Sequence, residues 1–207
     1  MLEKVINRDF PRSLESVTSK LDLNRRIETR LQGPNEGGFY STREERILCT
    51  PRDSIRGLWS GERGNSVYRL NECGPKEVKA NSILKSKGLD GISYKDGVPD
   101  FSKVAEVSLQ IPYMSGCRKN NFEQADSLLA GKWNIEAKNG KDNWTARDVK
   151  NYRKGGDETL SWHECSDGQR MDLVSFSVHS SFGHSGGVME CNKRSANVKY
   201  KGVRFDD

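Results

Sequence analysis

The strongest fold signal in this chain is the segment LSWHECSDGQRMDLVSFSVHSSFGHSGG, from Leu160 to Gly187. It contains all 3 histidines of the 207-residue sequence, at positions 163, 179 and 184. Histidine titrates near neutral pH and is the commonest metal ligand in proteins. A chain that gathers all of its imidazoles in one segment is expected to use them together.

The same stretch predicts two short strands followed by a helix. LSWHE and RMDLVSF have the apolar residues of half-buried strands, and the Asp-Gly pair between them is a hairpin signal. SVHSSFGH can form a short helix, with Ser175 or Ser177 as its cap. This order predicts that His163 and Glu164, at the end of the first strand, lie close to His179 on the helix.

Imidazoles and one carboxylate form a ligand set suited to a divalent cation such as Zn²⁺, Mg²⁺, Mn²⁺ or Ni²⁺. His184 follows the predicted helix, where three neighbouring glycines let the chain bend back toward the strands. A bound cation can activate water and stabilise the charge on a phosphate, while a free histidine takes a proton from the attacking water. This combination suits phosphodiester hydrolysis.

The residues from Trp162 to Gly187 resemble the signature of the HNH/endonuclease VII superfamily, in the branch named for its Trp-His-His motif. The likeness extends over roughly residues 37–190 and is strongest at 160–187. It implies an α+β fold class, with a mixed N-terminal part followed by a ββα-metal (HNH, treble-clef-like) nuclease unit. It also implies a toxin of bacterial competition, such as contact-dependent inhibition, that is neutralised by a cognate immunity protein. Such toxins leave the producing bacterium and act in the cytoplasm of the target cell.

One departure from the family pattern affects the expected roles. Glu164 stands where the family has a second histidine. Glutamate is a poor base at neutral pH unless burial raises its pKa, but it is a good cation ligand. We therefore expect His163 to be the general base, and Glu164, His179 and His184 to form the metal shell. Glu164 and His179 also count as catalytic residues, and the roles of His163 and Glu164 could be exchanged.

The rest of the chain predicts further organisation. We expect three parts, in order: a helical lead-in or linker at 1–36, a mixed α/β part at 37–118, and the nuclease domain at 119–207. NNFEQADSLLAGKWNI has helical spacing, with Gly131 as its stop. A second helix is predicted in NWTARDVKNYRKGG, where Thr145 can act as the cap and Asp148 follows three residues later.

Composition limits the class of protein. Charged residues make up 30% of the chain and the net charge is +5, which permits a polyanionic partner without requiring one. No apolar run is long enough to span a membrane, and the N-terminus has no secretory signal pattern. The 5 cysteines contain no CxxC pair, which argues against a disulfide framework and favours a reducing site of action.

Two basic groups flank the predicted metal site in the sequence. Charge runs are usually only solvated faces, but a nuclease must hold phosphates on both sides of the bond that it cuts. The residues expected to contact nucleic acid are Arg147, Lys150, Arg153, Lys154, Lys193 and Arg194.

These observations predict a metal-dependent endonuclease toxin that hydrolyses DNA in competitor bacteria. One alternative is an RNase toxin of the same delivery class, because the sequence does not show whether a 2′-hydroxyl takes part. Another is a non-catalytic module, binding nucleic acid or protein, with a structural zinc ion. Its ligands would be His163, Cys165, His184 and Cys191, although their spacings fit no common zinc knuckle.

Overall fold

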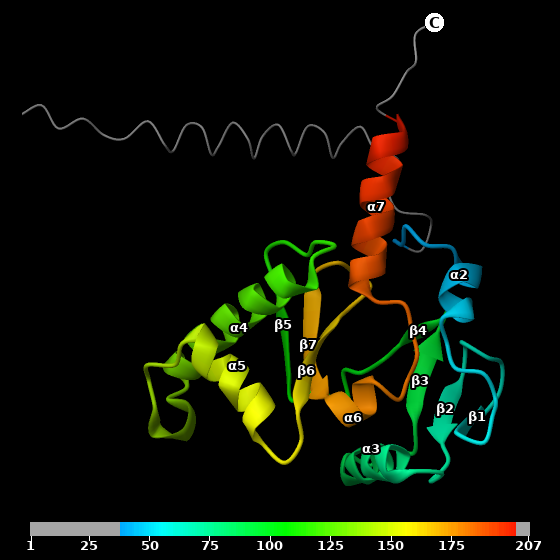
Figure 1. Ribbon diagram of the computed structural model, residues 1–207, viewed down its shortest axis with the longest axis horizontal. Helices are drawn as coiled ribbons and strands as arrows, with labels where there is room; N and C mark the ends of the chain where they lie inside the picture. The colour runs from blue at the N-terminus through cyan, green and yellow to red at the C-terminus, as the bar shows by residue number, and fades with distance from the viewer. Residues whose placement is uncertain (1–37, 202–207) are drawn as a thin grey trace, which may run out of the picture. The chain divides into compact units, whose positions relative to one another are not determined.

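The computed structural model describes residues 38–201. This part of the chain contains two antiparallel sheets (Figure 1). The four-stranded sheet has the order β1 (Gly57–Trp59), β2 (Val67–Leu70), β3 (Ile92–Lys95) and β4 (Val98–Pro99). The three-stranded sheet has the order β5 (Val107–Gln110), β7 (Arg170–Ser175) and β6 (Leu160–Glu164). The lead-in predicted at 1–36 lies outside the described residues.

Helices surround these sheets. They are α2 (Arg43–Leu48), α3 (Pro75–Ser86), α4 (Arg118–Ile135), the 3₁₀ turn η1 (Lys138–Gly140), α5 (Ala146–Gly155), α6 (Phe176–His179) and α7 (Gly187–Lys201). The mixture of helices and antiparallel sheets confirms the predicted α+β class. Among the described residues, no helix is both long and apolar enough to cross a membrane.

The three-stranded sheet separates two hydrophobic cores, because successive side chains of a strand point to opposite faces. Helices α4 and α5 cover one face, and α6 lies on the other (Figure 1). On the α4 and α5 side, Trp162 and Leu173 pack with Leu129 and Val149. On the α6 side, Val174 joins a core that extends to the four-stranded sheet.

Local capping explains where several helices begin. Thr145 and Asp148 form the predicted capping box at the start of α5, each side chain accepting a hydrogen bond from the other residue's backbone N–H. Ser175 caps α6 by accepting from the backbone N–H of Val178. The strand, turn, strand and helix predicted for residues 160–179 are therefore all present.

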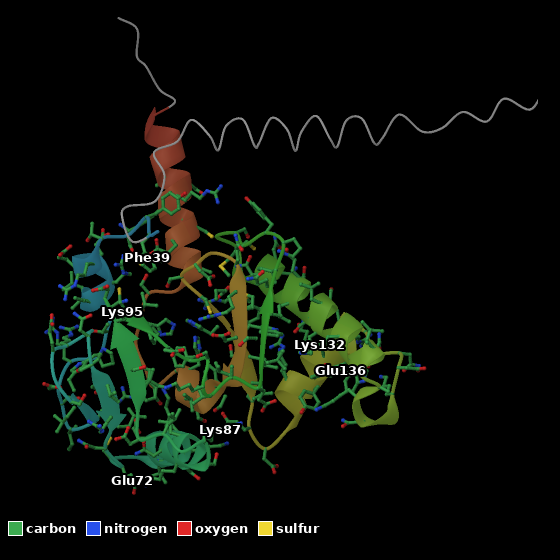
Figure 2. The ribbon with its side chains drawn as sticks, turned by 180° about the vertical axis from the view of Figure 1, so that it is seen from behind. Phe39, Glu72, Lys87, Lys95, Lys132 and Glu136 are labelled. Atoms are coloured by element: carbon green, nitrogen blue, oxygen red, sulfur yellow. The ribbon has the colours of Figure 1, made fainter. Side chains whose placement is uncertain are left out.

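Helix α4 does not stop at Gly131 as predicted but continues to Ile135. A glycine inside a helix costs about 1 kcal/mol relative to alanine. Burial of Trp133 against Trp144, with ring centroids 4.7 Å apart, exceeds that cost and extends the helix. Beyond the glycine, Lys132 and Glu136 form an ion pair on the exposed side of the helix (Figure 2).

The two predicted parts on either side of residue 118 share the three-stranded sheet. Strand β5 comes from before this position, and it pairs with β7 from after it, with Val107 opposite Leu173. The described residues all belong to one compact unit. The exact division of the chain into three parts stays a prediction.

Candidate metal centre

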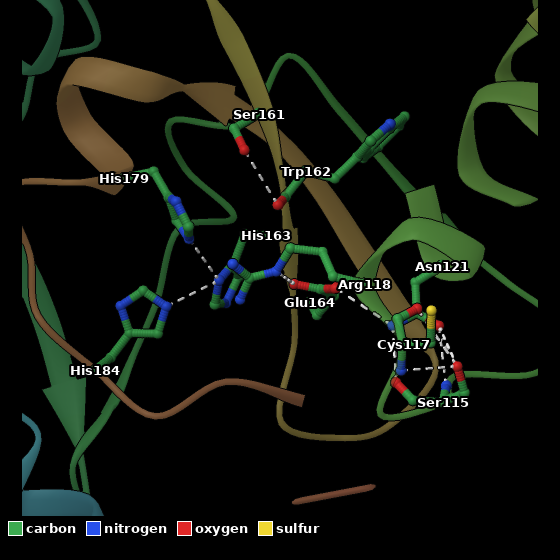
Figure 3. Close-up of polar contacts among 10 residues, drawn as sticks. All are labelled: Ser115, Cys117, Arg118, Asn121, Ser161, Trp162, His163, Glu164, His179 and His184. Atoms are coloured by element: carbon green, nitrogen blue, oxygen red, sulfur yellow. Dashed lines mark hydrogen bonds and ion pairs between the residues drawn. The ribbon is translucent and has the colours of Figure 1, made fainter. Parts of the chain in front are cut away.

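The imidazole rings of His163, His179 and His184 form a close cluster (Figure 3). Strand β6 supplies the first, the end of α6 the second, and the loop before α7 the third. The Nδ1 atom of His163 lies 3.3 Å from Nε2 of His179 and 3.1 Å from Nε2 of His184. The potential ligand atoms of all three rings lie within 4.8 Å of one another.

This arrangement fits a divalent cation. Nitrogen ligands bound tetrahedrally at about 2.05 Å from a zinc ion are about 3.3 Å apart, close to the two separations between ring nitrogens given above. Nδ1 of His184 lies 2.7 Å from the carbonyl oxygen of Phe182. A carbonyl only accepts hydrogen bonds, so this Nδ1 carries the proton and Nε2 turns its lone pair toward the other rings.

Burial keeps the three imidazoles neutral. It lowers the pKa of His163 well below the ordinary value, and the neighbouring His184 and His179 lower it further. Burial, followed by His184 and Arg118, lowers the pKa of His179 to about 3. Burial also lowers the pKa of His184, although its hydrogen bond to a carbonyl acts in the opposite sense. Neutral imidazoles are the form that binds metal ions, so the site needs no deprotonation at neutral pH.

An apolar wall supports the cluster. The fully buried ring of Phe101 lies edge-on to His163, with ring centroids 4.8 Å apart. The same ring lies 5.6 Å from the ring of His179 and 5.4 Å from that of His184, centroid to centroid. One aromatic side chain therefore limits the movement of all three imidazoles.

The glycines after His184 are required by close approach of the backbone rather than by unusual torsion angles. A Cβ atom on Gly186 would lie 2.9 Å from the carbonyl oxygen of Glu164, and one on Gly187 would lie 2.5 Å from that of Cys165. The chain therefore passes directly against the end of the hairpin. This contact holds His184 beside His163.

Glu164 does not join the histidine cluster. Its carboxylate accepts hydrogen bonds from Nε of Arg118 at 3.1 Å and from Nδ2 of Asn121 at 3.3 Å, both on α4 (Figure 3). The side chain is only 4% exposed. Burial raises the pKa of Glu164, although Arg118 and Asn121 act to lower it. The carboxylate is thus held on the α4 side of strand β6, one residue along from His163.

A cavity of about 710 Å³ gives access to both groups. All three histidines and Glu164 line it. Its other walls include two cationic and two apolar side chains: Arg118, Lys193, Phe182 and Met189. The cavity brings the imidazole cluster, a buried carboxylate and positive charge together in one space.

The basic residues predicted to contact nucleic acid are in four different environments. Lys193 lines the cavity and pairs with Glu45, while Arg194 is a half-buried residue of α7. Three others are exposed on α5, the helix on the sheet face opposite the histidines: Arg147, Lys150 and Lys154.

Arg153 belongs to the core. It is 4% exposed, and its Nε and one terminal nitrogen bind the two carboxylate oxygens of Asp126 at 2.8 and 2.7 Å. Nε1 of Trp162 donates to the same carboxylate at 2.8 Å. The structure therefore does not place Arg153 within reach of a phosphate, because a buried ion pair already occupies its guanidinium group.

The cysteines considered as zinc ligands lie apart from the imidazoles. Cys165 is buried with its Sγ 3.2 Å from an oxygen of Asp172, and Cys191 Sγ lies 3.4 Å from the carbonyl oxygen of Met114. Burial raises the pKa of both thiols, which disfavours thiolate. Within the described residues, the one group with metal-binding geometry consists of the three histidines.

Residues 91–186 match a family model described as the DNase/tRNase domain of colicin-like bacteriocin. This region is similar to a bacteriocin nuclease. It begins just before β3, ends just before α7 and includes all three clustered histidines. The match supports the predicted class, a nuclease toxin, and its description covers DNases and tRNases alike. No curated protein matches the sequence.

Proposed function

We propose that this chain is a divalent-cation-dependent endonuclease toxin of the HNH type, in a Trp-His-Glu variant, that hydrolyses phosphodiester bonds. The observation that carries the proposal is the convergence of the ring nitrogens of His163, His179 and His184 in one cavity. These residues lie within the part of the chain that matches bacteriocin nucleases. Three neutral imidazoles and an adjacent carboxylate are groups that hydrolysis of a phosphodiester can use.

The geometry favours an exchange of the roles first predicted for His163 and Glu164. His163, His179 and His184 would hold the cation, because their nitrogens have the spacing of a ligand set. When bound there, a divalent cation supplies a Lewis acid that stabilises negative charge on a phosphate. Glu164 would act as the general base, since its carboxylate lines the cavity but lies outside the ligand cluster. Burial raises its pKa toward the range that suits proton transfer near neutral pH.

DNA is the proposed substrate, on the strength of the resemblance to the HNH branch, and RNA is the alternative. The description of the matching family names both DNases and tRNases. As for a bacteriocin, the proposed target is a competing bacterium, where the toxin acts in the cytoplasm. A cognate immunity protein would protect the producing cell.

The proposal is tested by incubating the purified full chain with plasmid DNA and, separately, with bulk tRNA. Magnesium, manganese, nickel and zinc are each added, and a chelator is added to parallel samples. We expect cation-dependent cleavage that the chelator abolishes and that His179→Ala reduces by more than about 100-fold. Lys119→Ala, in a side chain that is 82% exposed, is the matched control and keeps full activity.

Cleavage of plasmid but not tRNA supports the DNase assignment, and the reverse supports the alternative. A protein that cuts neither polymer with any of the four cations would refute the proposed function. Cleavage that persists in His179→Ala would refute the assignment of the site.

A further inference from the structure

Arg118 begins helix α4 and lies beside Glu164, at the wall of the cavity that also contains the three histidines (Figure 3). It comes from a part of the chain more than forty residues before His163, so its position depends on the packing of α4 against the sheet. The guanidinium group and the three imidazoles therefore share one cavity.

Most hydrogen-bonding capacity of Arg118 is unused. A guanidinium group has five N–H donors in a planar fork. Among the described residues, the polar contact of this side chain is that of Nε with the carboxylate of Glu164, at 3.1 Å. The side chain is 64% exposed. Its terminal nitrogens are thus available to a second acceptor without loss of the first contact.

Glu164, the ion-pair partner of Arg118, is itself held in place, and it therefore orients the arginine side chain. Glu164 is 4% exposed and is also held by Asn121. A carboxylate that is anchored in this way holds Nε of Arg118 at the edge of the cavity. A carboxylate held in this way can orient an arginine side chain toward an anion that enters the cavity.

The other basic side chains of the region are less suitable. Lys193 also lines the cavity, but its ammonium group pairs with Glu45. Arg147 lies on α5, on the far face of the sheet. Arg118 therefore combines access to the cavity, spare donors and proximity to the imidazoles.

We propose that Arg118 binds a phosphate group of the substrate directly, next to the cation site, while its Nε stays on Glu164. The inference rests on the proposed function and deepens it, because it identifies the side chain that recognises the phosphodiester. Two parallel N–H···O bonds from an arginine fork match the geometry of two phosphate oxygens, whereas a lysine offers a point charge.

The test measures the binding of inorganic phosphate to the manganese-loaded full chain by isothermal titration calorimetry. Arg118→Gln keeps a donor for Glu164 but removes the charge and the fork, and Arg118→Lys keeps the charge alone. We expect phosphate affinity to fall by about tenfold or more in Arg118→Gln and by a smaller factor in Arg118→Lys. Manganese affinity and the midpoint of thermal unfolding should stay near the values of the unchanged protein. Lys119→Ala, one residue along, should leave all of these quantities unchanged.

Cleavage kinetics provide a second measurement on the same variants. Loss of a phosphate contact predicts a raised KM for nucleic acid in Arg118→Gln that is partly restored in Arg118→Lys. The inference is overturned if Arg118→Gln binds phosphate as tightly as the unchanged protein does. It is also overturned if both variants weaken manganese binding as much as phosphate binding, because Arg118 would then only support the histidine site.

Failure of the inference is distinguishable from failure of the proposed function. If the unchanged protein cuts neither DNA nor tRNA, the nuclease proposal fails, but the phosphate titration still decides whether Arg118 forms an anion site. If the unchanged protein cuts nucleic acid and Arg118→Gln cuts it with the same KM, the nuclease proposal stands and the role of Arg118 is refuted.

Discussion

Trp162 and His163 are consecutive residues of strand β6, and their side chains lie on opposite faces of the three-stranded sheet. Trp162 is fully buried on the α4 side, where Nε1 donates to Asp126 at 2.8 Å. His163 lies on the other side, with its ring 4.8 Å from that of Phe101. One face of the sheet therefore packs against α4 and α5, and the other holds α6 and the imidazole cluster. Substitutions on the two faces should have different effects.

Arg153→Met should destabilise the protein without a specific effect on cation binding. The change leaves the carboxylate of Asp126, 3% exposed, without its ion-pair partner, which costs roughly 3–5 kcal/mol for a buried pair. The free energy of unfolding in urea measures this loss. Arg147→Ala, at an exposed position of the same helix, should change the same quantity by less than about 0.5 kcal/mol. Equal stabilities of the two variants would contradict the buried ion pair.

Glu164→Gln and His163→Ala should separate the base from the ligands. If Glu164 is the base, Glu164→Gln keeps cation affinity and loses about 100-fold or more in the rate of cleavage. His163→Ala should lose both, because it removes one of three converging nitrogens. Calorimetric cation titration and a cleavage assay on the same preparations provide the two measurements. The opposite pattern, with cation affinity lost in Glu164→Gln and kept in His163→Ala, would restore the assignment first made from the sequence.

The metal-free protein should lose stability as the pH falls below neutral. Burial lowers the pKa of His163, His179 and His184, to about 3 for His179, whereas unfolded histidine titrates near 6.5. The unfolded chain thus binds more protons below pH 6.5, so stability from these groups is complete above that pH and is lost on acidification. The raised pKa of Glu164 has the opposite effect: above about pH 4.5, this group contributes more stability to the folded protein as the pH falls.

Urea unfolding in the presence of a chelator, at pH 7.5 and at pH 5, measures the effect. We expect a decrease of at least about 2 kcal/mol in the free energy of unfolding between these values. A saturating cation should raise the free energy of unfolding at pH 7.5, because it binds the folded site. A free energy that does not change over this range would mean that the imidazoles are exposed.

Glu158→Gln should weaken the start of α6, the short helix whose last residue is His179. The carboxylate accepts from the hydroxyl of Ser175 at 2.5 Å and from the backbone N–H of Ser177 at 2.9 Å, and it pairs with Lys79 at 2.6 Å. Burial alone would raise the pKa of Glu158, but Lys79, Ser175 and Ser177 outweigh it and lower the pKa to about 2. The loss in unfolding free energy at pH 7 should be on the order of 2 kcal/mol.

The pH dependence of that loss is diagnostic. The lowered pKa of Glu158 gives stability that is present above about pH 4.5 and is lost as the pH falls toward 2. The difference in unfolding free energy between Glu158→Gln and the unchanged protein should therefore become smaller between pH 4.5 and pH 2. Cation affinity should also fall in the variant, because α6 positions one ligand. Glu123→Gln, at an exposed ion pair on α4, is the control. A constant difference down to pH 3 would contradict the assigned interactions of Glu158.

The predicted structural features that the structure confirms depend on short-range rules. The hairpin signal and the apolar alternation placed His163, His179 and His184 within one supersecondary unit, and the three rings do converge. The capping box of Thr145 and Asp148 was equally local. Such contacts follow from residues a few positions apart, so composition and spacing are sufficient to find them.

Other features of the site are not marked by a motif or by a count of charges. The position of Glu164 outside the histidine cluster follows from strand alternation, which puts His163 and Glu164 on opposite sides of the sheet. The prediction that Glu164 is a metal ligand followed the family pattern instead. Arg153 follows Val149 by four residues, which puts it on the buried side of α5 despite its charge. Arg118 and Asp126 come from a helix distant in the sequence, and no local pattern marks them.

The core behind the imidazoles draws on both sides of residue 91, where the similarity to bacteriocin nucleases begins. Phe101 and Phe182 pack in the same cluster as Tyr68 and Leu84, which precede that boundary. A shortened protein that kept only the recognisable segment would expose this apolar surface to water. We therefore expect the residues before position 91 to be needed to keep the histidine rings in place, and a shortened protein has to retain them.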